Sequence, residues 1–194
     1  KLAPPSVNYS GANFLRNDDS ILYALGAIKN VGIESMKDLC NERNDNGNFN
    51  DLNDFINRNS TSVINKKTIE ALSCAGAFDE FNVNRSEVFN QAAEIVKYHK
   101  SRNNNNFDFQ KDMFDDLNVS NYSLAKEEEW KPSYKLMKEY EMLGFYLSGH
   151  PLETHKKNYK SLLLREYLEI KENSELQNQK DILLGGTLLS KKEK

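Results

Sequence analysis

Apolar residues recur at helical spacing through residues 33–100, and the runs are separated by short turns that contain small residues. The spacing predicts helices over about 33–43, 65–75 and 85–100, with another beginning near Leu52. Glycine and asparagine between the runs mark turns, because both residues tolerate unusual backbone angles. The fold class is therefore predicted to be mainly α, as a series of short helices rather than one long one.

The start of the chain is predicted to be extended. Pro4 and Pro5 disfavour helix in residues 1–24, and a glycine and an Asn-Asp-Asp run there indicate turns. Apolar residues alternate with other residues near the end of this stretch. That alternation predicts a short strand containing Ile21, Tyr23 and Leu25.

Helical periodicity is lost over residues 101–130. Residues 101–129 carry 3 basic and 7 acidic side chains, so this is the most acidic part of the chain and is predicted to be a solvated linker. A strong helix is then expected from Ser133 until Gly149 and the proline beyond it. Residues 182–189 are predicted to be a strand with a glycine bend.

Composition limits the possible classes of protein. Hydrophobic residues make up 38% of the 194 residues, which favours a chain of several parts over one well-filled core. The net charge of −3 carries no sign of a strongly basic nucleic-acid binder. No apolar run approaches the length of a membrane span, and Lys1 does not begin a signal peptide. Two distant cysteines indicate a reducing, cytoplasmic setting.

Two segments share a helix–turn–helix design, with turns at Lys29–Gly32 and Ala75–Ala77. Such a hairpin binds DNA when backbone N–H groups at a helix N-terminus hold a phosphate. Glycine suits this role, because a Cβ atom would block close approach. Ordinary helix-capping glycines explain the same spacing, and the spacing alone favours that alternative.

Four basic residues lie beside these turns and are candidates for phosphate contacts: Lys29, Lys66, Lys67 and Arg85. The alternative for each of them is a solvated charge at a helix end. Their shared placement next to the two turns is what favours the binding hypothesis.

Gln110, Asp112, Met113 and Phe114 lie within the acidic, aperiodic stretch. A polar anchor followed by two apolar anchors in a flexible chain is typical of a short linear motif that enters a partner's pocket. Folding back of the apolar side chains onto neighbouring helices is the equal alternative.

No catalytic set or metal site is predicted. Paired carboxylates, a phosphate loop and a nucleophile with its base are all missing from the pattern. The histidines do not form a ligand spacing with Cys40 or Cys74.

Taken together, the motifs resemble the C-terminal half of the bacterial DNA polymerase III alpha subunit, a C-family replicative polymerase. The matching stretches occur in that family's order and are PPSVN (4–8), YALGAIKNVG (23–32), NKKTIEAL (65–72), AGAFD (75–79), QKDMF (110–114) and LGFYLSGHPL (143–152).

The resemblance implies an order of parts along the chain. These are the end of the fingers (1–25), a tandem helix-hairpin-helix region (26–100), a linker with a sliding-clamp motif (101–130), a connecting helix (131–160) and the start of an OB-fold (161–194). The family's catalytic palm would lie upstream, so the resemblance implies no catalytic residue and no cofactor in this stretch. Magnesium is implied for the parent polymerase.

The resemblance also implies site residues. DNA would contact Lys29, Asn30, Gly32, Lys66, Lys67, Gly76 and Arg85, and the clamp would contact Gln110, Asp112, Met113 and Phe114. The family usually has glycine where this chain has Asn30. Asparagine tolerates left-handed backbone angles, but its side chain could crowd a phosphate, which weakens the case for the first turn.

The function implied is part of a DNA-directed DNA polymerase that grips duplex DNA and is tethered to its clamp. Expected partners are the primer–template duplex, the clamp (beta subunit) and other replicase subunits, with no membrane. The alternatives are a stand-alone, non-catalytic adaptor that binds DNA and clamp, and a nuclease or repair enzyme with the same hairpin. The lack of an initial methionine and the strand near the end favour the polymerase piece.

Overall fold

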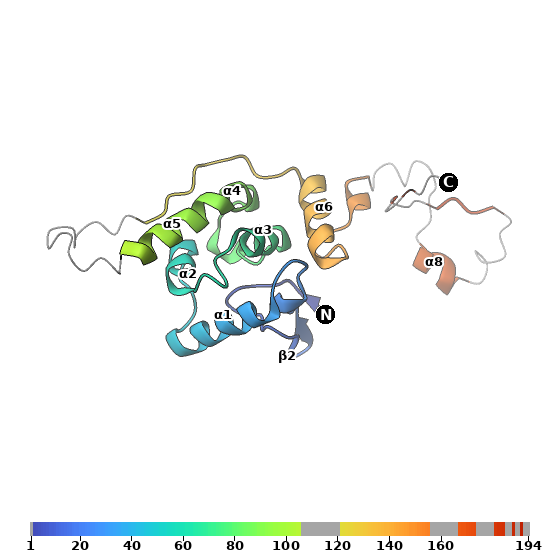
Figure 1. Cartoon of the computed structure of the whole chain (residues 1–194). Coiled ribbons are helices and arrows are strands. Elements are labelled where there is room, and N and C mark those ends of the chain that lie inside the picture. The colour runs from blue at the N-terminus through green and yellow to red at the C-terminus, as the bar shows by residue number, and fades with distance from the viewer. Residues whose placement is uncertain are drawn as a thin grey trace. The chain divides into compact units, whose positions relative to one another are not determined.

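The computed structural model describes residues 2–105, 121–155, 167–173, 181–184, 188 and 191. The chain divides into two compact units, Lys1–Leu147 and Ser148–Lys194 (Figure 1). The elements described in the first unit are β1 (Leu2–Ala3), β2 (Leu15–Asn17), β3 (Ser20–Leu22), η1 (Leu25–Ala27), α1 (Ile33–Asn46), α2 (Leu52–Arg58), α3 (Lys66–Ala75), η2 (Asp79–Phe81), α4 (Arg85–Asn90), α5 (Ala92–Asn105) and α6 (Pro132–Leu143). The prediction of a mainly α fold is confirmed.

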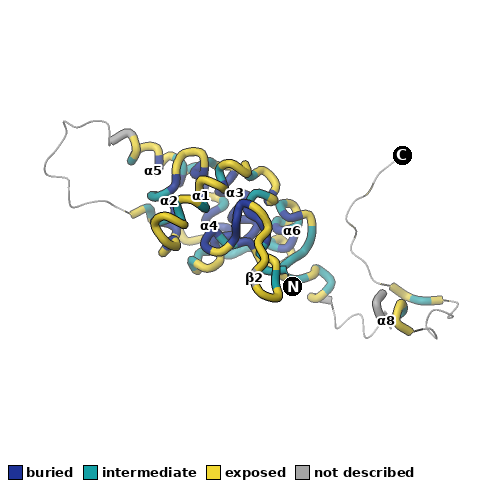
Figure 2. The backbone as a smooth tube through the Cα atoms, turned by 90° about the horizontal axis from the view of Figure 1, so that it is seen from below, coloured by how far each residue is buried: buried dark blue, intermediate teal, exposed yellow. Residues whose placement is uncertain are grey.

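A small sheet precedes the helices, with strand order β1-β3-β2. Leu2 of β1 pairs in parallel with Ile21, and Leu15 of β2 pairs antiparallel with Leu22. The hairpin of β2 and β3 is largely exposed, as the yellow tube at β2 in Figure 2 shows. The predicted strand ends earlier than expected, because Leu25 begins the 3-10 turn η1.

Several helices begin and end for local reasons that the sequence carries. The Asp51 side chain accepts the N–H of Asp54 at the start of α2, and that of Asn65 accepts the N–H of Thr68 at the start of α3. Gly76 ends α3 with φ of +82°, a left-handed angle at which glycine carries no Cβ penalty.

Several predicted helix boundaries differ in the structure. The first helix, α1, continues to Asn46, and α5 continues to Asn105, inside the stretch predicted to be a linker. The helix expected over 85–100 is broken at Gln91 into α4 and α5. The later helix, α6, ends at Gly144, whose φ of +83° stops the helix before the predicted Gly149.

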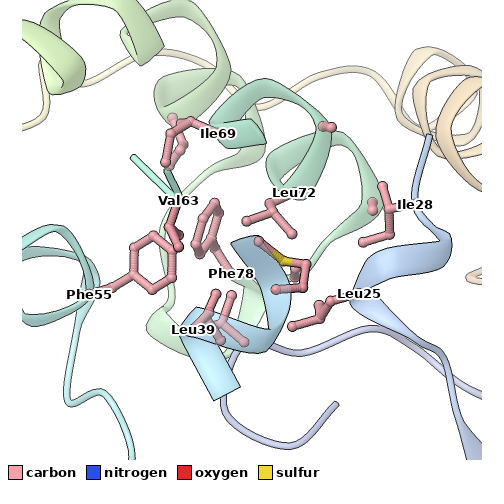
Figure 3. Packing of buried hydrophobic residues seen from close by; sticks show 14 of the residues in the cluster. Leu25, Ile28, Leu39, Phe55, Val63, Ile69, Leu72 and Phe78 are labelled. Atoms are coloured by element: carbon pink, nitrogen blue, oxygen red, sulfur yellow. The ribbon is translucent and has the colours of Figure 1, made fainter. Parts of the chain in front are cut away.

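Both helix–turn–helix segments share one hydrophobic core. Side chains from η1, α1, α2 and α3 converge there, as Figure 3 shows for Leu25, Leu39, Phe55 and Leu72. The ring of Phe55 packs edge-on against that of Phe78, with centroids 5.0 Å apart. The two turns are therefore carried by a single packed body.

The extended N-terminal segment joins the two hairpins. Asn8 Nδ2 donates to the carbonyl of Phe49 at 2.9 Å, and its Oδ1 accepts the N–H of Phe49 at 2.8 Å. Val7 N–H donates to the carbonyl of Ala77 at 3.0 Å. Residues at the start of the chain thus hold the loop after α1 and the turn after α3 in place.

Residues 121–131, here called the strap, cross α5 and α4 before α6 begins (Figure 1). The side-chain amide of Gln91 bonds to the backbone of the strap in the way that the backbone of a paired β-strand would. Its Nε2 donates to the carbonyl of Ala125 and its Oε1 accepts the N–H of Ala125, both at 2.8 Å. Asn53 on α2 donates to the carbonyl of Tyr122 at 3.1 Å.

The second unit contains η3 (Pro151–His155) and α8 (Tyr167–Glu172) among its described residues. Leu184 forms an isolated bridge, and most of the predicted strand over 182–189 lies outside the described residues. The expected start of an OB-fold stays a prediction.

Candidate nucleic-acid interface

The first predicted turn, between η1 and α1, lies on the surface. Lys29, Asn30 and Gly32 are exposed, and Gly32 immediately precedes the first residue of α1. Asn30 has a φ of +69°, a left-handed angle that asparagine adopts more readily than most residues. The turn therefore forms with asparagine at the position where the resemblance implies glycine.

This turn leaves hydrogen-bond donors available. Among the described residues, no side chain accepts a hydrogen bond from the first N–H groups of α1, and its N-cap residue is Gly32. Within the described part of the chain, the backbone N–H groups of Asn30 and Gly32 have no hydrogen-bond acceptor. Unsatisfied N–H groups and the helix dipole together favour an anion at such a helix end. The first turn can therefore hold a phosphate without reading a base.

Charges around the first turn are mixed. The exposed side chain of Lys29 provides a cation beside it. Glu34 lies in the first turn of α1, where its charge opposes a bound anion. Lys37 Nζ lies 2.7 Å from the Glu34 carboxylate, and both side chains are exposed, so solvent screens this pair.

The second predicted turn, residues 75–77, is buried. Its N–H groups are already bonded within the fold. Gly76 donates to the carbonyl of Ser73 at 3.1 Å, and Ala77 donates to that of Leu72 at 2.9 Å. This turn closes the end of α3 and does not present these donors to solvent.

Arg85 lies inside the fold next to this turn, with 6% of its surface exposed. Its Nε lies 2.8 Å from an oxygen of Asp79, and its Nη1 donates to the carbonyl of Cys74 at 3.2 Å. Burial alone would lower the pKa of Arg85, but Asp79 and Glu139 outweigh that effect and raise it. A Cβ atom on Gly76 would overlap the guanidinium. The glycine therefore leaves room for Arg85.

A carboxylate occupies the N-terminus of α4. Glu129 of the strap accepts the N–H of Arg85 at 3.1 Å and that of Ser86 at 3.4 Å. Burial would raise the pKa of Glu129, but backbone N–H donors, first that of Trp130, and the charge of Lys135 lower it. The helix end after the second turn is therefore capped by an anion from the same chain.

Comparison with known proteins agrees with this hairpin architecture. A family model described as "Helix-hairpin-helix motif" matches residues 1–88. Proteins named "DNA polymerase III subunit alpha" match from Caulobacter vibrioides (40% identity over 150 residues, 77% of this chain), Campylobacter jejuni (34% over 197, 97%) and Aquifex aeolicus (33% over 195, 100%).

Over most of its own length, the chain is homologous to DNA polymerase III alpha subunits. It covers 13%, 16% and 15% of the length of these three relatives, respectively. It thus corresponds to a limited stretch of the proteins it resembles.

The other predicted site residues fall elsewhere. Lys66 and Lys67 are exposed at the start of α3, and Lys66 Nζ lies 3.7 Å from the carboxylate of Glu70. Their role at a phosphate stays a prediction. The predicted clamp residues Gln110, Asp112, Met113 and Phe114 all lie outside the described residues.

No catalytic centre emerges from the described residues. They contain no group of three or more His, Cys, Asp or Glu side chains able to hold a metal ion. Burial raises the pKa of Cys74 to about 12, so its thiol is not an available nucleophile. Among the same residues, no helix is both long and apolar enough to cross a membrane.

We did not predict from the sequence that the side chains of Glu129 and Glu139 bond to other residues inside the fold. Glu129 belongs to a run of three glutamates, a pattern that predicts side chains exposed to solvent. Glu139 carried a usable signal, because it lies on the same helical face as Leu136 and Leu143. An acid in an apolar stripe indicates a buried partner.

Proposed function

We propose that this chain contributes non-catalytic DNA grip to a DNA-directed DNA polymerase, and that the first turn is its phosphate contact. The observation that carries the proposal is the exposed, uncapped N-terminus of α1 behind Asn30 and Gly32. The duplex backbone would accept hydrogen bonds from these N–H groups, and the Lys29 ammonium would add charge attraction. Binding would be independent of base sequence.

The second turn would support the fold rather than the DNA. Its backbone donors are bonded internally, and Glu129 already occupies the N-terminus of α4. The phosphate contacts first expected at Gly76 and Arg85 would require these groups to leave their present partners. The two turns would thus differ in role although they share one sequence design.

Nucleotide transfer would belong to other parts of the polymerase. The relatives are much longer than this chain, and polymerases of this kind use metal ions held by carboxylates. The described residues offer no such carboxylate set.

A sliding clamp is the proposed second partner, through Gln110, Asp112, Met113 and Phe114. Two apolar side chains within an acidic, aperiodic stretch support this proposal. Attachment to a ring around DNA would turn dissociation of the polymerase into rebinding at high local concentration. Contacts with other replicase subunits belong to the same proposal.

DNA grip is tested by the salt dependence of binding to a labelled duplex. Lys29→Ala should bind more weakly and lower the slope of log affinity against log salt by about one, as expected for the loss of one phosphate contact. Lys97→Ala is the matched control, since Lys97 is exposed on α5 and paired with Glu94. Equal slopes for wild type and Lys29→Ala would argue against the first turn.

A further inference from the structure

The buried face of α6 has an acid at its centre. Leu136 and Leu143 are 9% and 8% exposed, and Glu139 between them is only 1% exposed. Residues three and four positions apart share one face of a helix, so an apolar residue would be expected here. Burying a carboxylate is costly unless it is paired, and its partners therefore define its role.

Glu139 joins α6 to the second turn. Its Oε2 lies 3.6 Å from Nη1 of Arg85, which is itself buried. Its Oε1 accepts the backbone N–H of Leu147 at 2.6 Å, which fixes the chain just after α6. The guanidinium of Arg85 also bonds to Asp79, so Arg85 connects Glu139 of α6 with the segment that follows α3.

The end of α6 contacts the first turn. The Met142 carbonyl accepts the backbone N–H of Lys29 at 3.0 Å, and the hydroxyl of Tyr23 lies 3.5 Å from the carbonyl of Leu143. The last carbonyl groups of a helix have no hydrogen-bond donor within the helix, so the carbonyls of Met142 and Leu143 are available to residues outside α6. The bonded N–H of Lys29 immediately precedes the left-handed residue Asn30.

We infer that Glu139 is a positioning residue for the proposed phosphate contact. Its ion pair with Arg85 fixes where α6 lies, and α6 in turn fixes the backbone of Lys29 in the first turn. This inference rests on the proposed DNA grip. A well-packed apolar pair can stabilise a fold as much as a buried ion pair or more. Charged hydrogen bonds are directional, however, so an ion pair also fixes the orientation of the two elements that it joins.

The test replaces the pair by apolar residues of similar size, in the double variant Arg85→Met/Glu139→Leu of the full chain. Arg58→Met/Glu42→Leu is the matched control, because Arg58 and Glu42 form an ion pair at 3.0 Å that involves neither turn. Glu139→Gln is the second test variant, since glutamine can still accept the N–H of Leu147 but lacks the charge that faces Arg85.

Two readouts are needed, both on protein shown to be folded by denaturant titration. Amide hydrogen exchange at Lys29 should quicken in both Glu139 variants and stay unchanged in the control. Affinity for duplex DNA should fall about tenfold, as for the loss of one charged hydrogen bond. The control should keep wild-type affinity after correction for its folded fraction.

Unchanged exchange at Lys29 would overturn the link through α6. The inference would also be overturned if exchange at Lys29 became faster but DNA affinity stayed at the wild-type value. Full DNA affinity in a stable double variant would overturn it in the same way, because Glu139 would then have a structural role only. Failure of the unmodified chain to bind DNA is a separate result, which would overturn the proposed function and this inference with it.

Discussion

The carboxylate of Glu129 accepts the backbone N–H of Arg85 at 3.1 Å and places a negative charge at the N-terminus of α4. Within the part of the chain that the structure describes, no side chain does the same for α1, whose N-cap is the exposed Gly32. Two turns with one sequence design therefore differ in what they offer to a phosphate. One helix end is already capped by an anion, and the other presents unbonded donors.

Gly32→Val should weaken DNA binding without harming the fold. Gly32 has a φ of −78°, which any residue can adopt, and the atom nearest an added Cβ would be Ser35 Oγ at 3.4 Å. A branched side chain would nevertheless keep a phosphate away from the N–H groups behind it. We expect an affinity loss of about tenfold, measured by fluorescence anisotropy with a labelled duplex. Wild-type affinity in the folded variant would contradict the assignment.

Gly76→Val should instead destabilise the protein. The φ of +82° is strained for any residue with a Cβ atom, at a cost of about 1–3 kcal/mol, and the new side chain would also overlap the guanidinium of Arg85. Urea titration should show the loss. Affinity per folded molecule should remain near that of wild type. If the Gly76→Val protein were stable but lost its affinity for DNA, the phosphate contact would lie at the second turn instead of the first.

The sequence predicted local features better than long-range ones. The start of α3 near residue 65 and its end near residue 75 depend on neighbouring residues, and the structure agrees with both. The second turn instead lies beside the buried ion pair of Arg85 with Glu139, a residue far away in the sequence. The position of Glu139 in an apolar stripe indicates a buried partner but does not say which residue it is, so the structure was needed to tell the two turns apart.

Mild acid should destabilise the fold through His99. This side chain is buried, its Nε2 lies 3.0 Å from the carbonyl of Asn59, and its Nδ1 has no partner within the described residues. Burial lowers the pKa of His99, although the bond to the Asn59 carbonyl opposes that shift. The unfolded chain therefore binds the extra proton first, and stability falls as the pH drops through about 6.5.

Urea titrations at about pH 7.5 and about pH 5.5 measure this effect, because ordinary carboxylates change little over that interval. His99→Gln removes the titrating group and should reduce the difference between the two conditions. The same difference in wild type and variant would show that His99 is not the cause.

The clamp proposal predicts that replacing both Met113 and Phe114 by Ala abolishes binding to a purified sliding clamp. Burying each side chain in a clamp pocket is worth roughly 1.5–3 kcal/mol, and ordering a flexible segment offsets part of it. DNA affinity and helix content should not change. A peptide of residues 107–117 should compete with the chain for the clamp.

Two results would count against this tether. A loss of helix content in the double variant would mean that the two side chains belong to the core. Equal clamp binding by variant and wild type would place the tether in another segment.

The phosphate contact at the first turn is tested most directly by titrating the isotope-labelled chain with a short DNA duplex and following the backbone amide signals in NMR spectra. We expect the amide signals of Asn30, Gly32 and Ile33 to show the largest shifts, while those of Gly76 and Ala77 hardly move. The largest shifts at Gly76 and Ala77, or none at the first turn, would contradict this expectation.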